Sequence, residues 1–533
     1  MNIKDLVRLL TRLLNIAFWM ILAYLAGDVG MGFYYLGFIL AEVLIVIFSG
    51  GLKQSIAKMV AVRRAKGLHY NSKLIFRYGV LYSLIIGLTL GFVMWTFSGK
   101  IYLKAVGYIL PESVFAVIGV YFAIHMLSGC LQGYYQGRGN TVICIVAELA
   151  KVVIALILCP VLVIRMYKYG MNISGLLKNP LYANIGGAIG AVMAQCIGGL
   201  LCIIILIVGD RIAGTVDRNE YNSVKGVDNG RNITLSFIKG CLQYIAEHIA
   251  PVLTIAGLLL IYIRSASANN TDIKEAFAGI GVFADKYLII IGLIIAIFIE
   301  FVDRECKKIR VDVSHEEHKN VRQRATYLLK NTVILLLPAT LILIISSAAV
   351  VNILFGGRVT LGAEMLKKGG IVLLLAGISY MCKNVFNSIR ISRYSILGSV
   401  SGMIVTLLCA GAMIGKGDDP TGLVIAYVIG YMVEALILLI VFYRMIGFDL
   451  IDIGIRMGKI VVSAGIFAGM LAILDHFIVM NILFIIIAIL ISYAAYSVSL
   501  VVLKAVGSRD INSLKGTLIY YPLVFVGNFF VNR

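Results

Sequence analysis

About fourteen separate apolar stretches follow one another along this chain of 533 residues, and each is long enough to cross a lipid bilayer. A helix needs roughly 20 mostly apolar residues to span the hydrocarbon core, and no water-soluble core needs such a series. The composition agrees, because 60% of the residues are hydrophobic and 14% are charged, against about 25% charged in an ordinary soluble domain. We therefore predict an all-α polytopic membrane protein that acts on something within, or crossing, a membrane.

Polar or glycine-containing turns separate most of the predicted spans and set their bounds. The spans are expected at residues 6–26, 31–51, 75–97, 113–134, 140–163, 184–209, 233–262, 277–301, 328–354, 369–388, 394–415, 421–443, 457–480 and 482–503. Beyond the last span, the apolar piece Leu518 to Phe530 is too short for a span and is expected at the membrane interface.

Two features recur along the chain at an offset of about 250 residues. Spans two and eight each lead into a strongly basic link, and the turn at Arg138 has a counterpart at Arg390 and Arg393. This recurrence predicts two six-helix lobes with a pseudo-twofold relation, followed by two extra helices. The expected division is an N-lobe at 1–210, a cytoplasmic linker at 211–232, a C-lobe at 233–446, and spans 13 and 14 with a cytoplasmic tail at 447–533.

Loop lysines and arginines indicate the orientation, because they are concentrated on one side of the predicted spans. This bias predicts a multi-pass protein of the cytoplasmic membrane with both termini in the cytoplasm. The net charge of +20 is attributed to the same bias and to anionic lipid headgroups. Nucleic-acid binding is not expected, since the basic residues are dispersed over many short loops. No cleavable signal peptide is expected, because Lys4, Asp5 and Arg8 lie at the start of the first helix.

Motifs for enzymatic chemistry are missing from the sequence. It contains no phosphate-binding P-loop, no His-Glu-x-x-His metal motif and no Gly-x-Ser-x-Gly nucleophile elbow. His315 and His318 flank two glutamates in a loop, where a solvated charged segment is favoured over a metal site. We therefore expect no enzyme, no metal and no cofactor, and coupling to a proton or sodium gradient stays open.

Three segments in the first 150 residues carry a family resemblance. Gly27–Leu36, continued by Ser49–Lys58 and Arg63–Gly67, resembles the first-to-second-helix signature of Gram-positive polysaccharide and lipid-linked-oligosaccharide flippases. Leu131–Asn140 resembles the turn between helices four and five of the same proteins. They belong to the multidrug, oligosaccharidyl-lipid and polysaccharide exporter superfamily, which includes lipid II flippases and a sporulation-type branch.

The chain departs from this family at two places. Trp19 and Tyr24 stand late in the first helix, where the sporulation and lipid II branches commonly carry arginines that face the pyrophosphate of the lipid carrier. Lys53 stands where a proline is expected. These differences count against lipid II as the substrate and leave the broader flippase interpretation intact.

Ionisable residues inside a membrane are costly, so each one is a functional candidate. The resemblance implies a cavity between the lobes that is lined largely by spans one, two, seven and eight. The candidates that line it are Glu42, Lys239, Glu247, His248, Arg264, Asp285 and Lys286. In such a cavity a cation can hold a pyrophosphate, and a carboxylate can bind sugar hydroxyls or carry a coupling ion.

Other intramembrane charges have simpler explanations. Glu148 and Lys151 are three residues apart on one helix face, which favours a structural pair. His125 is expected to be a satisfied helix-packing residue. Lys383 is expected to extend towards the cytoplasm, and Glu434 in span twelve is another intramembrane charge.

The predicted function is translocation of an undecaprenyl-pyrophosphate-linked oligosaccharide or polysaccharide precursor by alternating access. Two alternatives stay open: a multidrug or cation antiporter of the same superfamily, and a non-transporting membrane scaffold that retains the fold. The expected partners are a lipid-linked saccharide, membrane lipids, and glycosyltransferases or polymerases of the cell envelope.

Overall fold

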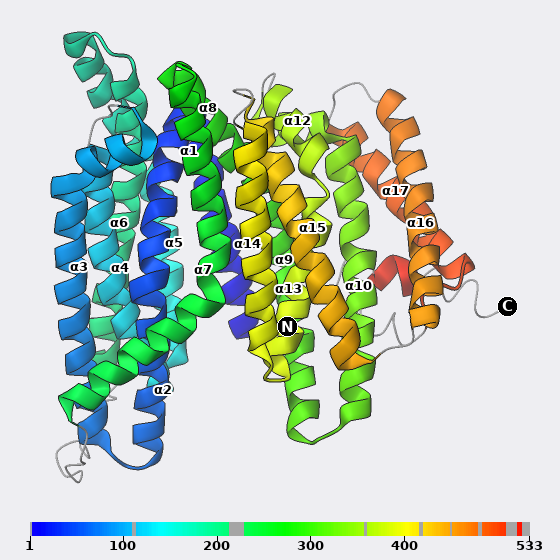
Figure 1. Ribbon diagram of the computed structural model, residues 1–533, viewed down its shortest axis with the longest axis horizontal. Helices are drawn as coiled ribbons and strands as arrows, with labels where there is room; N and C mark the ends of the chain where they lie inside the picture. The colour runs from blue at the N-terminus through cyan, green and yellow to red at the C-terminus, as the bar shows by residue number, and fades with distance from the viewer. Residues whose placement is uncertain are drawn as a thin grey trace. The chain divides into compact units, whose positions relative to one another are not determined.

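The computed structural model describes residues 3–108, 113–212, 229–356, 360–414, 419–447, 450–477, 482–507 and 520–524. Within these ranges the secondary structure is helical and contains no β-strand (Figure 1). The elements are α1 (Ile3–Ile45), the π-helical η1 (Val46–Gly50), α2 (Gly51–Ala65), α3 (His69–Val106), α4 (Ser113–Gly137), α5 (Thr141–Leu177), α6 (Leu181–Ile212), α7 (Gly230–Ala268), α8 (Ile273–Val282), the π-helical η3 (Phe283–Leu288), α9 (Ile289–Ser314), α10 (His318–Ile345), α11 (Ser347–Phe355), α12 (Thr360–Gly369), α13 (Val372–Ser388), α14 (Ser392–Ile414), α15 (Thr421–Ile446), α16 (Leu450–Phe477) and α17 (Ile482–Val502).

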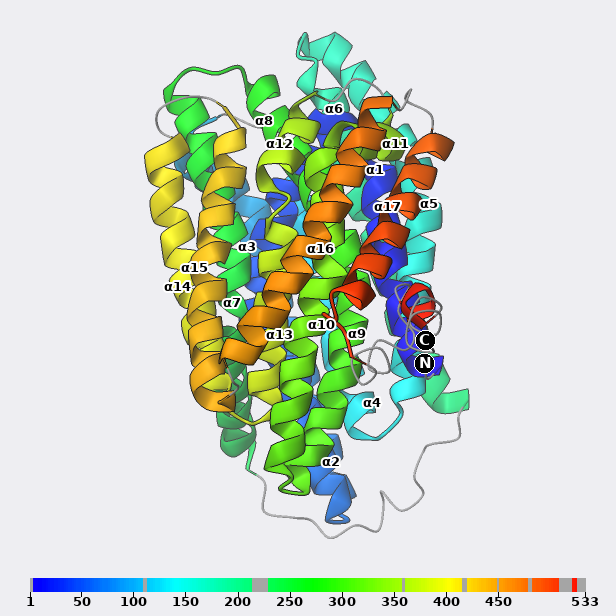
Figure 2. The same ribbon diagram turned by 90° about the vertical axis from the view of Figure 1, so that its right-hand side faces the viewer.

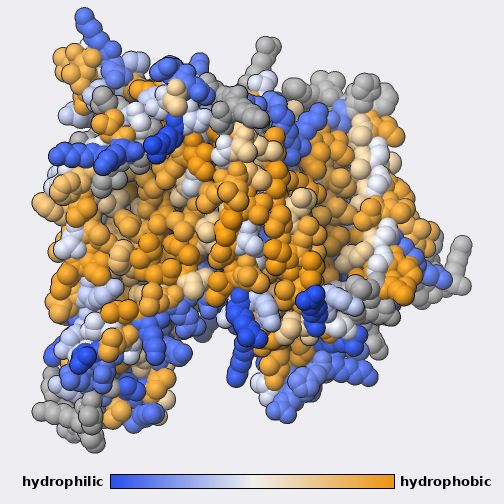
Figure 3. All heavy atoms as spheres, viewed as in Figure 1, coloured by the Kyte–Doolittle hydropathy of each residue, from blue (hydrophilic) through white to orange (hydrophobic). Residues whose placement is uncertain are grey.

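The predicted all-α polytopic fold is confirmed. Among the described residues, 12 helical stretches are long and apolar enough to cross a membrane, or 13 if α12 and α13, which are bent by 50°, form one span. Hydrophobic side chains gather midway along the helices, and hydrophilic side chains gather near their ends (Figure 3). The expected count of about fourteen is not confirmed, because the first two predicted spans fall within one helical stretch, Lys4–Ala65.

Gly27 divides that stretch. Its backbone angles, φ 67° and ψ 177°, lie outside the helical region and are accessible mainly to glycine. As a straight helix, 62 residues would measure about 93 Å, roughly three times the thickness of the hydrocarbon core. The first two predicted spans are therefore two helical segments that follow each other directly, with a kink at Gly27 between them. The sequence predicted a turn at this position, and the structure has the kink there without a loop.

The chain forms two compact units, built mainly from residues 2–285 and from residues 286–413 and 419–533. In the first unit, α5 packs on α6, α3 on α4, and α1 on α4, α5, α6 and α8. In the second unit, α13 packs on α9, α10 and α15, and α16 lies beside α17 (Figure 2). The six-plus-six division stays a prediction, and most of the expected linker at 211–232 lies outside the described residues.

Glycines explain why α7 and α8 pack with α1 and α2 in the first unit. A Cβ atom on Gly281 of α8 would lie 1.8 Å from the Asp28 carbonyl oxygen, so the two backbones meet directly. Phe33 and Phe277 stack beside this contact with ring centroids 4.1 Å apart. Further along the chain, at the first residue of α2, a Cβ atom on Gly51 would lie 2.4 Å from Cα of Cys241 in α7.

The segments that carry the family resemblance also pack against each other, α2 on α4. Lys53 Nζ donates a hydrogen bond of 2.6 Å to Gln132 Oε1. A Cβ atom on Gly133 would lie 2.5 Å from the Lys53 carbonyl oxygen, and one on Gly137 would lie 2.7 Å from the Ala57 carbonyl oxygen. The two sequence motifs therefore form the two sides of a single helix–helix contact.

Gly133→Ala is expected to destabilise the protein by about 1–3 kcal/mol, because the new methyl group has only backbone to push against. The matched control is Gly175→Ala in α5, where an added Cβ would meet nothing within 4 Å. That change is expected to stabilise the helix by up to about 1 kcal/mol. Thermal unfolding of the detergent-purified variants measures both effects, and equal Tm values for the two variants would contradict the prediction.

Candidate functional site

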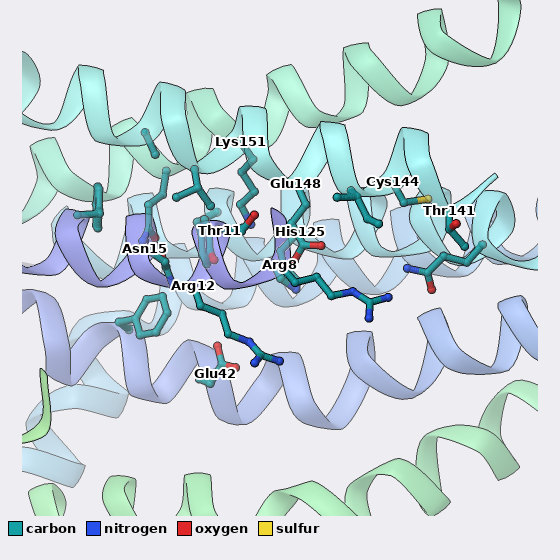
Figure 4. Close-up of a pocket in the computed structure, with 18 residues that line it drawn as sticks. Arg8, Thr11, Arg12, Asn15, Glu42, His125, Thr141, Cys144, Glu148 and Lys151 are labelled. Carbon is teal, nitrogen blue, oxygen red and sulfur yellow. The ribbon is translucent and has the colours of Figure 1, made fainter. Parts of the chain in front are cut away.

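The first compact unit contains a cavity of about 670 Å³ between α1, α4, α5 and α6 (Figure 4). It is lined by both polar and aromatic side chains. The lining residues used below are Arg8, Thr11, Arg12, Asn15, Phe38, Glu42, Tyr121, His125, Thr141, Cys144, Glu148, Lys151 and Gln195. A cavity inside a membrane-spanning helix bundle that holds this many ionisable groups is a candidate binding site.

The first segment of α1 supplies one polar stripe. Arg8, Thr11, Arg12 and Asn15 are spaced by three, one and three residues, so they lie on one helical face, which lines the cavity. The beginning of this helix is attached to α5, because Lys4 Nζ donates a hydrogen bond of 3.3 Å to Thr141 Oγ1.

The start of α5 supplies the opposite stripe, Thr141, Cys144, Glu148 and Lys151, at spacings of three, four and three residues. Within the described part of the chain, Glu148 and Lys151 do not form the ion pair that their spacing predicted. Lys151 Nζ instead lies 5.7 Å from the centroid of the Tyr121 ring, at cation–π distance. Both charges are therefore left facing the cavity.

Two buried polar atoms in the lining have no hydrogen-bond partner among the residues that the structure describes. These are Nδ1 of His125 and Oε1 of Gln195, and the Gln195 side chain is 7% exposed. His125 packs on Tyr121, with ring centroids 5.9 Å apart, as expected of a helix-packing residue, but no described side chain or backbone group satisfies its Nδ1 atom. A buried polar group without a hydrogen-bond partner is costly, so a bound polar ligand or a water molecule would supply the hydrogen bonds that both atoms lack.

Glu42 is the predicted site residue that lines this cavity. It comes from the second segment of α1, after the Gly27 break, and its side chain is half-buried. Figure 4 shows Glu42 and Arg12 extending into the cavity from the two segments. Glu42 has no hydrogen-bond or ion-pair partner within the ranges described.

The other predicted site residues lie elsewhere. Lys239, Glu247, His248 and Arg264 are on α7, where all but the half-buried Glu247 are exposed. Pro251 has no backbone N–H, so the helical hydrogen bond to the Glu247 carbonyl oxygen is missing, and α7 is bent (Figure 1).

Asp285 and Lys286 lie in the π-helical turn η3, where both are buried, at 0% and 5% exposure. Neither they nor the four α7 residues line the cavity, so a binding role for these six residues stays a prediction.

The second unit contains a buried ion pair. Lys383 Nζ of α13 lies 2.7 Å from Glu434 Oε1 of α15 and 3.3 Å from Ser399 Oγ of α14. The Lys383 side chain is 21% exposed and that of Glu434 is 9% exposed. The expectation that Lys383 extends towards the cytoplasm is wrong, because Glu434 binds it between three helices.

Sequence reasoning did not identify Arg8, Arg12, His125, Glu148 and Lys151 as site residues. A signal for four of them is present, because α1 and α5 each carry polar residues at i, i+3 or i+4, and i+7 within an otherwise apolar span. In the described ranges no group of three or more His, Cys, Asp or Glu is placed to hold a metal ion.

No protein-family model matches the chain, and no curated protein matches its sequence. Its fold matches solved structures of low sequence identity. An inward-facing multidrug resistance MATE family transporter of the MOP superfamily aligns with a TM-score of 0.63 and 15% identity, over 83% of this chain and 98% of that one. Lipid II flippase MurJ, in an inward closed conformation, aligns with a TM-score of 0.67 and 13% identity, over 96% and 99%.

A third structure is a MOP superfamily transporter from Pyrococcus furiosus, for which a reverse polarity of the binding pocket suggests a different function. It aligns with a TM-score of 0.55 and 16% identity, over 84% of this chain and 94% of that one. The resemblance inferred from Gly27–Lys58 and Leu131–Asn140 is thus confirmed at the level of the fold. This chain is a multi-pass membrane protein with the all-α fold shared by the MATE transporters and the lipid II flippase MurJ.

Proposed function

We propose that this chain is a transporter that moves a lipid-linked saccharide of the undecaprenyl-pyrophosphate type across the cytoplasmic membrane by alternating access. The observation that carries the proposal is the cavity of the first unit, in which Arg8, Arg12 and Lys151 face the same space. The likeness to a lipid II flippase over 96% of this chain supports the same class of function.

The cavity chemistry suits a phosphorylated sugar. Arginine forks bind phosphate oxygens in pairs, and a lysine adds a compact point charge. The amides of Asn15 and Gln195 can pair with sugar hydroxyls, and the ring of Tyr121 offers an apolar face. Three cationic and two carboxylate side chains line the cavity, and Asp5, 3.7 Å from Arg8, offsets part of the positive charge at its edge.

A second candidate function is multidrug or cation antiport, as in the MATE transporter of similar fold. The observation in its favour is the pair of carboxylates, Glu42 and Glu148, in the same lining. Cationic drugs would have to bind beside three cations, which is electrostatically unfavourable. This candidate predicts that overexpression raises drug tolerance, and the flippase proposal predicts no change.

Depletion of the protein is expected to cause lipid-linked saccharide to accumulate on the cytoplasmic face of the membrane, because a headgroup that carries pyrophosphate does not cross the bilayer unaided. The measurement is the accessibility of the saccharide to a membrane-impermeant enzyme, in intact and in opened cells, with its identity read by mass. Re-expression of the chain is the control. Normal surface glycan without accumulation would contradict the proposal.

A further inference from the structure

We propose that Glu42 is a resident negative charge that offsets the cations of the cavity, that an anionic ligand takes over this role, and that protonation of Glu42 therefore strengthens anion binding. This inference rests on the proposed function, since it takes the cavity as the anion site. It adds a proton to the binding reaction, taken from solvent by a carboxylate oxygen of Glu42 as the anion arrives.

The fold of α1 brings this arrangement about. Arg8 and Arg12 precede the Gly27 break and Glu42 follows it, so residues 30 or more positions apart face one cavity (Figure 4). Lys151 of α5 lines the same cavity. Glu42 has no ion pair closer than 4 Å in the described ranges, so an anion that enters the cavity does not have to break a direct contact of this carboxylate.

Charge balance explains why a carboxylate is present here. Several cations gathered inside a membrane-spanning helix bundle are costly without nearby negative charge, and Glu42 with Glu148 offsets part of that cost. When a dianion binds, it takes over this role, and an ionised Glu42 then repels it. Proton and anion binding are consequently linked, and each strengthens the other by the same factor.

Other titratable groups face Glu42, and the experiment has to distinguish their protonation from that of Glu42. Tyr121 and His125 come from α4, Cys144, Glu148 and Lys151 from α5, and Tyr244 from α7, while α6 contributes Gln195, which does not titrate. The tight contact of α8 with α1 lies at the other end of the segment, near Asp28. His125 and Glu148 are the important competitors, since gain of a proton by either one would also favour an anion.

The test uses the purified full-length chain and inorganic sulfate, whose charge is constant between about pH 8 and about pH 5. Sulfate affinity of the unsubstituted protein is expected to rise about tenfold over this range, with proton uptake detected by an indicator dye in weak buffer. Glu42→Gln is expected to bind as tightly at pH 8 as at pH 5, without proton uptake. Glu42→Asp is expected to restore the dependence of sulfate affinity on pH. This result would show that the missing pH dependence of Glu42→Gln is not caused by a folding defect.

His125→Gln and Glu148→Gln are the matched variants, and both are expected to keep the pH slope. A full slope in Glu42→Gln, or a slope abolished by either matched variant, would overturn the assignment of the proton to Glu42. Failure of the unsubstituted protein to bind sulfate or pyrophosphate at any pH is a different result, since it removes the anion site and the proposed function with it.

Discussion

Lys383→Met is expected to lower the free energy of unfolding by about 3–5 kcal/mol, because it leaves the Glu434 carboxylate buried without its partner. Glu434 is 9% exposed, and its Oε1 atom lies 2.7 Å from Lys383 Nζ. Among the described residues the remaining donor is Ser399 Oγ at 3.5 Å, which is too distant to replace an ammonium group. Chemical unfolding in detergent, followed by circular dichroism, measures the change.

Two further variants make this prediction specific. The double variant Lys383→Met/Glu434→Leu removes both charges and is expected to recover most of the lost stability. Lys368→Met breaks an exposed pair with Glu364 at the same distance of 2.7 Å, together with a 3.2 Å hydrogen bond to Thr421 Oγ1, and its expected cost is about 0–1 kcal/mol. If the double variant is as unstable as the single one, the pair does not explain the loss.

Arg12→Gln/Lys151→Gln is expected to weaken pyrophosphate binding about 100-fold, or roughly tenfold for each lost charge. Both side chains line the cavity of the first unit, and each substitution keeps a polar side chain of useful length. Calorimetric titration of the purified variant with pyrophosphate gives the affinity, and the same variant is expected to fail in the saccharide-accessibility assay.

The matched control is Lys239→Gln/Arg264→Gln, which removes two exposed cations of α7. These residues were predicted to line a cavity between the lobes, and they do not line the cavity of the first unit. Unchanged pyrophosphate affinity in this control is expected. If the control loses affinity and Arg12→Gln/Lys151→Gln does not, the anion site lies along α7.

Much of the fold could be predicted, because a membrane span requires a long apolar run that is visible without any partner residue. Ser113–Gly137, Thr421–Ile446 and Ile482–Val502 lie within a few residues of the predicted spans. The count was less predictable, since it depends on backbone geometry at Gly27, where one residue breaks a helix without a polar loop.

The candidate site was harder to predict because it depends on which helix faces meet. Glu42 was identified from its position within an apolar run, and that rule needs no knowledge of packing. Arg8 and Arg12 lie near a helix end, where arginines commonly act as topology signals. Lys151 has Glu148 one turn before it, and only the packing of α4 on α5 shows that it lies over Tyr121 instead.

The position of Arg8 and Arg12 has a practical consequence for handling the protein. Chain ends usually tolerate trimming and fusion, since few contacts depend on them. Here the first twelve residues supply two cavity cations, and Lys4 among them donates a hydrogen bond to Thr141 of α5. A preparation shortened by a dozen residues would lack two of the cations that we propose to bind the anion. Affinity tags are therefore better placed at the C-terminus when binding is to be measured.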